Sequence, residues 1–435
     1  AAGLLGRLLT GKKPKNTVFY AREGYLACAM SWILLSLVGA IPFYASREIP
    51  SLTDALFEII SGFTTTGSSI LTDVEALSHC MLFWRSFSHW IGGMGVLVFL
   101  LAILPMAGGQ NMHLMRAESP GPSVGKLVPN VRKTASLLYG IYLAMTFVQI
   151  LLLLIGNMPL FDAICISFGT AGTGGFGIKN SSMGEYSTYI QAVVTIFMFL
   201  FGVNFNFYYL LLLKKPKDAL RMEEVRGYVL LYVLAVLLIT VNITTHLGEL
   251  GKNFHHVAFS VSSIMTTTGY GTVDFNLWPQ FSRVLMVALM FVGACAGSTG
   301  GGMKVSRFIM YGKAVKKELA FLLHPRSVKV VRVDDKALEH ETVRTTNAFL
   351  IAYVLVFLVS LLVLSLDGFD LETSFTAVAA TINNIGPGLG EVGASGNFSA
   401  FSPLSKFVMM FDMLAGRLEL FPMLLLFYPA TWRKH

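Results

Sequence analysis

Long apolar stretches alternate with shorter polar connections along most of the chain. Several of them approach or exceed the roughly 20 apolar residues that a helix needs to cross a bilayer. They cover residues 24–45, 137–156, 190–213, 228–243 and 348–366. The pattern predicts an all-α polytopic membrane protein, because a helix satisfies its own backbone polar groups in lipid.

The same order of elements recurs four times. Each copy has an apolar span, a helix-like segment too short to cross, a loop rich in Gly and Thr, and a second apolar span. A ten-residue helix is only about 15 Å long, roughly half of the hydrocarbon thickness. We therefore expect four re-entrant loops, whose central glycines are Gly67, Gly175, Gly269 and Gly386.

The repeats divide the chain into five predicted parts. A basic N-terminal segment, 1–22, opens with Ala instead of Met, and we expect it to be truncated upstream. The four pseudo-repeats that follow are predicted at 23–115, 116–222, 223–325 and 326–435.

Residues before the loops support this alignment. Asp54 and Asp162 each lie thirteen residues before their central glycine. At the predicted start of a short helix, a carboxylate suits the positive end of the helix dipole. The short helices thus predict a common direction, with their negative C-terminal ends at the loops.

Four irregular loops at membrane depth indicate one shared cavity, because non-helical backbone is tolerated there only when buried in protein or lining water. Rings of backbone carbonyls can replace the hydration shell of a potassium ion. Glycine permits the left-handed backbone angles that turn successive carbonyls towards one axis. The sequence therefore predicts a single cation filter built from four non-identical loops.

The loops differ in how closely they follow the Thr-Val-Gly-Tyr-Gly signature of potassium channels. Residues 267–271, Thr-Thr-Gly-Tyr-Gly, are close to it, and residues 173–177 are a looser copy. The first loop has Ser68 and Ser69 where an aromatic residue and glycine would stand, and the fourth has Pro387. A fourfold-symmetric filter is therefore excluded, and the degree of potassium selectivity stays open.

Together with residues 88–95 (Ser-His-Trp-Ile-Gly-Gly-Met-Gly) and 297–304 (Gly-Ser-Thr-Gly-Gly-Gly-Met-Lys), these loops resemble the bacterial TrkH-type membrane subunit of the Trk/Ktr/HKT potassium transporter superfamily. The resemblance covers residues 16–435. It implies that each repeat has an outer helix, a pore helix with filter loop and a second helix around one pore. The potassium-coordinating residues it implies are Thr65, Thr66, Gly67, Thr173, Gly174, Gly175, Thr267, Thr268, Gly269, Asn384, Ile385 and Gly386. Plant relatives that favour sodium tend to have serine at the position of Gly67, so glycine there favours potassium.

A glycine-rich segment, 293–302, interrupts the span after the third loop. Each helix-interior glycine costs about 1 kcal/mol relative to alanine, so a continuous helix is not expected. A Walker phosphate loop is not matched, because Met303 separates Gly302 from Lys304. Close helix packing through small residues remains an alternative. The resemblance implies an intramembrane gate below the filter, formed by Gly297, Ser298, Thr299, Gly300, Gly301 and Gly302.

Arg417 is the one cation placed by sequence deep inside an apolar run. A charge there is costly and is expected to face a cavity or a carboxylate, for which Asp412 and Glu419 are candidates. A buried ion pair that only packs helices is the alternative. The resemblance places Arg417 beneath the filter, bonded to the glycine-rich segment as part of the gate.

Composition and charge agree with a membrane location. Hydrophobic residues make up 54% of the chain and charged residues 13%, against roughly 25% charged in soluble domains. Most of the 33 Lys and Arg lie in 1–22, in the connections 106–133, 214–227 and 303–344, and in the C-terminal tail. This asymmetry places those parts in the cytoplasm and the loops outside, so the net charge of +8 needs no nucleic-acid partner.

The long basic stretch 304–344 has two interpretations, an anchor at anionic lipid headgroups or a docking site for a cytoplasmic protein. The resemblance implies a TrkA-type ring of nucleotide-binding regulatory subunits and a homodimer. We expect no cofactor in this chain, and any response to ATP or NAD would come through that partner. The four cysteines and nine histidines match neither a disulfide framework nor a metal spacing.

The predicted function is potassium uptake across a bacterial inner membrane through a gated, cation-selective pore, with no enzymatic activity. A sodium-permeable transporter, or proton- or sodium-coupled symport on the same framework, is the alternative of the same class. An intramembrane enzyme would need a nucleophile, base or metal constellation, which the sequence does not suggest. A sensory scaffold would not explain four loops in register.

Overall fold

A computed structural model describes residues 21–95, 131–248, 250–326, 330–334 and 336–433. The predicted N-terminal segment lies almost entirely outside these ranges, as does the predicted boundary between the first two repeats at residues 115 and 116. Among the described residues the regular structure is helical apart from one antiparallel hairpin, β1 (Arg332–Val333) with β2 (Lys336–Ala337), and one isolated parallel bridge between Val292 and Met303.

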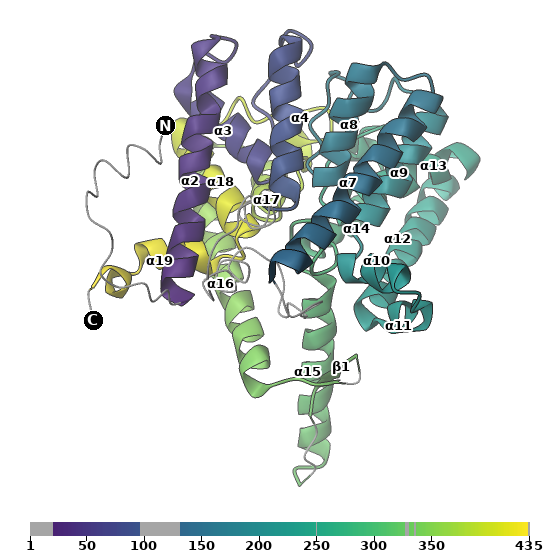
Figure 1. Ribbon diagram of the computed structural model, residues 1–435, viewed down its shortest axis with the longest axis vertical. Coiled ribbons are helices and arrows are strands. Elements are labelled where there is room, and N and C mark those ends of the chain that lie inside the picture. Colours follow the sequence, from purple (N-terminus) through teal and green to yellow (C-terminus); the bar gives the residue numbers. More distant parts are fainter. Residues whose placement is uncertain (1–20, 96–130, 249, 327–329, 335, 434–435) are drawn as a thin grey trace.

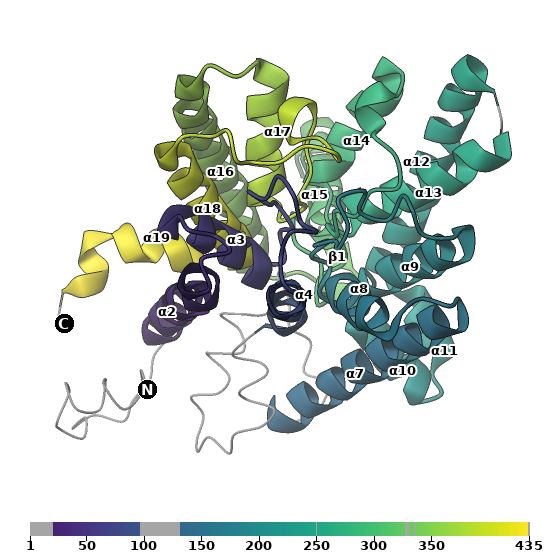
Figure 2. The ribbon, with the colours of Figure 1, turned by 90° about the horizontal axis from the view of Figure 1, so that it is seen from above.

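Four groups of three helices follow one another around a common centre in chain order (Figure 2). Each group contains a long helix, a shorter helix that ends near the centre, and a third helix. The groups are α2 (Ala21–Ala45), α3 (Leu52–Phe63) and α4 (His79–Gly93); α7 (Val131–Ile155), α8 (Leu160–Gly172) and α9 (Thr188–Phe201); α12 (Glu223–Leu247), α13 (Leu250–Met265) and α14 (Gln280–Phe291); and α16 (His340–Leu364), α17 (Leu371–Ile382) and α18 (Pro403–Arg417). This arrangement confirms the predicted all-α membrane fold with four pseudo-repeats.

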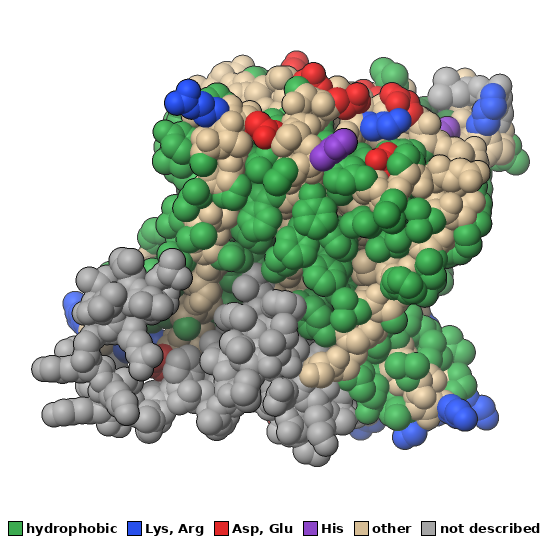
Figure 3. Space-filling model, turned by 45° about the horizontal axis from the view of Figure 1, so that its top comes forward, with side chains coloured by type: hydrophobic (Ala, Val, Ile, Leu, Met, Phe, Trp, Pro, Cys, Tyr) green, Lys and Arg blue, Asp and Glu red, His purple; other side chains and the backbone are tan. Residues whose placement is uncertain are grey.

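The first helix of every group is long and apolar enough to cross a membrane. Large apolar side chains remain uncovered along these helices, such as Ile155, which is 70% exposed, and Leu362, which is 69% exposed. Figure 3 shows the resulting apolar band, with acidic side chains gathered along one rim. A band of this kind suits contact with lipid tails, and it confirms four of the five predicted spans.

The fifth predicted span, 190–213, is broken. Its helix α9 ends at Phe201, and α10 (Phe205–Leu212) continues at an angle of 90°. The backbone groups at the break bond to the glycine-rich segment: Cys295 N–H donates to Gly202 O at 3.0 Å, and Phe205 N–H donates to Gly297 O at 3.0 Å. The apolar run therefore turns where another segment satisfies its backbone.

The remaining helices lie at the periphery. The helix α15 (Val305–Leu323) projects far beyond the body, at the end where the basic helix α11 (Pro216–Arg221) also lies (Figure 1). The helix α19 (Phe421–Phe427) follows α18. Short 3-10 turns complete the described chain: η1 (Phe275–Leu277), η2 (Ser365–Asp367), η3 (Gly390–Val392) and η4 (Pro429–Trp432).

Candidate functional site

The four short helices end in the same hydrogen-bonded turn. In the first loop, Thr65 N–H donates to Gly62 O at 3.1 Å and Thr66 N–H donates to Ser61 O at 2.8 Å. The same pair of bonds recurs at the equivalent residues of the other three loops. This is the Schellman pattern, which ends a helix with one residue in the left-handed conformation.

The left-handed residue of that turn is not a glycine in any of the four loops. It is Thr65 (φ 55°), Thr173 (φ 55°), Thr267 (φ 58°) and Asn384 (φ 54°). A β-branched residue in this region is an outlier that persists only where the surroundings impose it, commonly at functional sites. The glycine two residues later also has a positive φ in every loop, between 78° and 102°. Each loop therefore has two residues with positive φ. From the sequence, such angles were predicted for the glycines only, and the residue two positions earlier was missed.

The loops form a closed ring in which each central glycine faces the backbone of the next loop. A Cβ added to Gly67 would lie 2.0 Å from the carbonyl oxygen of Gly174, and one on Gly175 would lie 1.9 Å from that of Thr268. The ring continues from Gly269 to Ile385 O at 2.2 Å and closes from Gly386 to Thr66 O at 2.9 Å. All twelve residues predicted for the filter are thus brought together: Thr65, Thr66, Gly67, Thr173, Gly174, Gly175, Thr267, Thr268, Gly269, Asn384, Ile385 and Gly386.

A cavity of about 100 Å³ opens over the ring and touches all four central glycines. Two basic side chains are among its described lining residues, and both are paired. Arg85 Nε lies 2.8 Å from Glu58 Oε1, and Lys179 Nζ lies 3.1 Å from Glu185 Oε2. The hydrogen bond from Lys179 lowers the pKa of the Glu185 carboxyl. The mouth of the ring therefore does not present unpaired positive charge from these two residues.

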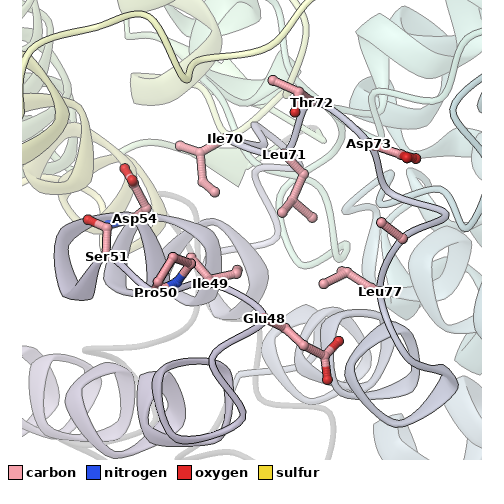
Figure 4. Close-up of a pocket in the computed structure, with 11 residues that line it drawn as sticks. Glu48, Ile49, Pro50, Ser51, Asp54, Ile70, Leu71, Thr72, Asp73 and Leu77 are labelled. Carbon is pink, nitrogen blue, oxygen red and sulfur yellow. The ribbon is translucent and has the colours of Figure 1, made fainter.

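A second cavity, of about 330 Å³, lies between the residues at the start of α3 and the segment that follows the first loop (Figure 4). Three acidic side chains line it, but all three are already engaged. Glu48 accepts from Ser78, Asp54 pairs with Lys406 at 2.7 Å, and Asp73 accepts from Asn180 at 2.8 Å. Its described lining contains none of the twelve filter residues, so we do not assign it to the site.

The glycine-rich segment lies directly against the inner side of the ring. As predicted, it interrupts the helix: α14 ends at Phe291 and α15 begins at Val305. Gly301 N–H donates to Thr267 Oγ1 of the third loop at 2.6 Å, and a Cβ on Gly301 would lie 2.6 Å from Asn383 O of the fourth. Only a residue without a side chain fits this approach.

Arg417 connects the glycine-rich segment with the first repeat. Its guanidinium donates to Thr299 O at 2.8 Å, to Thr65 Oγ1 at 3.2 Å, and to the carbonyls of Gly92 and Gly93 at the end of α4. Of the two carboxylates considered from sequence, Asp412 accepts from Ser360 at 2.8 Å. The other, Glu419, pairs with Arg307.

Two buried charges at the glycine-rich segment were missed by sequence reasoning. Lys304 is buried and its ammonium donates to the carbonyls of Gly300 and Gly301. Glu224, in the first turn of α12, accepts from Ala296 N–H at 2.6 Å and Ser306 N–H at 3.2 Å. Both lie in connections that were predicted from the sequence to be cytoplasmic. The sequence signals were only that Glu224 directly precedes an apolar run and that Lys304 directly follows the glycine-rich segment.

Three further buried polar residues lie behind the first two loops and were also missed. Glu58 is on α3, and Arg85 and His89 are on α4. No pattern in the sequence pointed to an association of these three side chains.

Comparisons with known proteins agree with this arrangement. Residues 4–434 match the sequence profile of the TrkH family, described as cation transport protein. The Trk system potassium uptake protein TrkH of Salmonella typhimurium is 39% identical over 425 residues, which are 95% of this chain and 86% of that protein. The protein of the same name from Escherichia coli K12 is 39% identical over 421 residues, with the same coverage. The crystal structure of the potassium transporter TrkH from Vibrio parahaemolyticus aligns with a TM-score of 0.87 at 35% identity, covering 99% of this chain and 90% of that chain.

Proposed function

The chain belongs to the TrkH family of cation transport proteins, and from that membership we propose that it takes up potassium through one gated pore within a single subunit. The observation that carries the proposal is the closed ring of four loops, each facing the backbone of the next. Potassium is the transported substrate. Enzymatic catalysis has no part in the proposal.

The ring serves as the selectivity filter. An ion that enters it exchanges its water for backbone carbonyls of the twelve residues named above, with threonine hydroxyls adjoining the inner side. The C-terminal ends of α3, α8, α13 and α17 lie at the loops, and their partial negative charge favours a cation there. The loops are not identical, so the carbonyls do not form fourfold-symmetric layers.

The gate is the segment Gly297 to Gly302 together with Arg417 and Lys304. Three successive carbonyls of this segment, those of Thr299, Gly300 and Gly301, accept from the two cationic side chains. Two positive charges at the inner side of the ring oppose a passing cation. Opening requires that the segment and these side chains move away from the loops.

Orientation follows from charge. The acidic rim above the ring faces outward, and the basic end with α11 and α15 faces the cytoplasm of a bacterial cell with the chain in its inner membrane. A TrkA-type regulatory ring docks at that basic end and carries any response to ATP or NAD, and the transporter is a homodimer. The repeats that build the pore are taken at 23–115, 116–222, 223–325 and 326–435.

Flux measurements on the purified chain in lipid vesicles test the proposal. With an imposed potassium gradient we expect potassium and rubidium to move down their gradients, sodium to move more slowly, and a proton gradient to make no difference. If potassium flux depends on a proton or sodium gradient, the protein is a coupled transporter and the proposal of a pore is wrong. Gly269→Ser should reduce the preference for potassium over sodium, because its Cβ would meet Ile385 O. Unchanged selectivity in that variant would overturn the filter assignment.

A further inference from the structure

The junction between the first and second loops is supported by buried charges. Glu58 and His89 are fully buried and Arg85 is 2% exposed. Placing an ion pair in the interior costs desolvation that its mutual attraction repays only with good geometry and further hydrogen bonds. The partners of these three side chains show what the arrangement holds in place.

Arg85 belongs to the first repeat but holds the second loop. Its Nη1 donates to Gly177 O at 3.1 Å, and its guanidinium carbon lies 4.0 Å from the centre of the Phe176 ring. Both residues directly follow the central glycine of that loop. Its Nε donates to Glu58 at 2.8 Å and its Nη2 donates to Ser69 Oγ at 3.4 Å, so the guanidinium is also fixed from the side of the first loop.

Glu58 holds the outer end of the first loop. Its carboxylate accepts from Ile70 N–H at 3.0 Å and from Ser69 Oγ at 2.9 Å. Ser69 is one of the two residues at which this loop departs from the potassium-channel signature. The third loop has Tyr270 and Gly271 at the equivalent positions, and the Tyr270 hydroxyl donates to Ile166 O at 3.2 Å. The junction between the first and second loops is therefore supported by an ion pair, whereas the junction between the second and third loops is supported by a tyrosine hydroxyl.

His89 links the same two loops closer to the centre. Its Nδ1 lies 2.8 Å from Gly62 O, and its Nε2 lies 3.3 Å from the backbone nitrogen of Phe176. A carbonyl can only accept and a backbone N–H can only donate, so the ring is the neutral tautomer with its hydrogen on Nδ1. A Cβ on Gly174 would lie 2.2 Å from this ring, so His89 also limits where the second loop can move.

We propose that Glu58, Arg85 and His89 form a buried brace that fixes the second loop against the first and thereby sets the selectivity of the ring for potassium over sodium. The inference rests on the proposed function of the ring as a filter. The three are positioning residues, since they act on the ring through Ser69, Phe176 and Gly177. Glu58 has a second effect, because it neutralises an arginine that lines the outer mouth.

The test compares rubidium and sodium flux through reconstituted variants. Arg85→Met, Glu58→Gln and His89→Asn should each lower the rubidium-to-sodium flux ratio by about tenfold, equivalent to ~1.4 kcal/mol of differential ion stabilisation. Glu58→Gln should also reduce total cation flux, because Arg85 is then uncompensated at the mouth. The double variant Glu58→Gln/Arg85→Met removes both charges and leaves no unpaired buried charge. It can therefore be measured even if a single variant does not fold. It should retain the lowered ratio, since Gly177 O has lost its donor.

Lys406→Met is the matched control. It breaks the ion pair of Lys406 on α18 with Asp54 at 2.7 Å, in the first turn of α3 and thirteen residues before the central glycine of the first loop. We expect it to lower thermal stability and leave the flux ratio unchanged. A fall in the ratio as large as that of the brace variants would attribute the effect to general destabilisation and overturn the proposal.

Gly269→Ser, measured in parallel, separates failure of the brace from failure of the filter. If Gly269→Ser lowers the ratio while the double variant and His89→Asn keep it, the brace is wrong and the filter stands. If Gly269→Ser also keeps the ratio, the ring is not the filter and both proposals fall.

Discussion

Arg417 and Thr299, 118 residues apart, are joined by a hydrogen bond of 2.8 Å between Nη1 and the carbonyl oxygen. The same nitrogen lies 3.2 Å from Thr65 Oγ1 in the first loop. One side chain thus contacts the glycine-rich segment and the ring at once. Movement of the segment and ion binding in the ring are therefore expected to influence each other.

Removal of this cation should open the pathway. At an effective dielectric constant near 20, a unit charge at about 5–10 Å raises the energy of a passing cation by about 2–3 kcal/mol. We expect Arg417→Ala to increase rubidium flux about tenfold or more in the absence of any partner protein. Arg221→Ala, on the peripheral helix α11, serves as the control and should behave like the unmodified chain. An unchanged or lower flux in Arg417→Ala would contradict a barrier role.

The four central glycines should differ in their tolerance of alanine. A Cβ would approach a neighbouring carbonyl oxygen to 2.0, 1.9 and 2.2 Å at Gly67, Gly175 and Gly269, but only to 2.9 Å at Gly386. Left-handed alanine alone costs about 1–3 kcal/mol, and the overlap adds to it at all four positions, least at Gly386. Gly386→Ala should therefore retain the most transport and thermal stability. Gly312→Ala, where a Cβ meets nothing within 4 Å, is the neutral control.

Glu224 should hold the glycine-rich segment closed. Its carboxylate accepts backbone N–H groups on either side of residues 297–302, from Ala296 and Ser306. Glu224→Ala leaves both donors buried, at about 1–3 kcal/mol each, and we expect lower thermal stability with higher basal flux. Glu224→Gln keeps an acceptor oxygen and should be milder. The neighbouring Glu223→Gln, which affects a partly exposed pair with Lys313, should change neither quantity appreciably. Equal effects of the two neighbouring substitutions would refute the role of Glu224.

Asn384 should matter through its side chain and its backbone separately. Its amide donates to Thr66 Oγ1 and Met413 O, both at 2.9 Å, while its φ is 54°. Asn384→Gly loses the two side-chain hydrogen bonds but adopts the left-handed conformation without strain. Asn384→Ala loses the same hydrogen bonds and is also strained in that conformation. We expect selectivity to fall in each variant and thermal stability to fall further in the alanine variant. If alanine is tolerated as well as glycine, left-handed strain at this position is unimportant.

The apolar spans and the four loops could be predicted because both are local properties of the sequence. Spans such as 24–45 and 348–366 are long runs, and the loop glycines recur between them in register. The break at Gly202 was not predicted, although Gly202 and Asn204 interrupt the apolar run and Asn204 caps α10 by accepting from Asn206 N–H. The chain turns there because residues of the 293–302 segment bond its backbone.

The buried charges were beyond sequence reasoning for a related reason. Lys304 and Glu224 lie at the ends of spans, where a basic or acidic residue is ordinarily solvated. Glu224 is buried by a segment that lies more than 70 residues away in the sequence, where it accepts a hydrogen bond from Ala296 N–H. Glu58 and Arg85 are 27 residues apart on different helices, and only the packing of α3 against α4 brings them together. Pairing of this kind is a property of the folded chain.

The ion pair between Glu58 and Arg85 is possible behind the ring only because the four loops belong to one polypeptide. In an assembly of four identical subunits, any such pair would be copied at every junction, surrounding the ion with four arginines and four glutamates. A single chain can instead give each junction its own chemistry, here an ion pair between the first and second loops and a tyrosine hydroxyl between the second and third. Four repeats in one chain therefore free the support of the pore from symmetry, while every loop keeps the same hydrogen-bonded turn and the same positive-φ glycine.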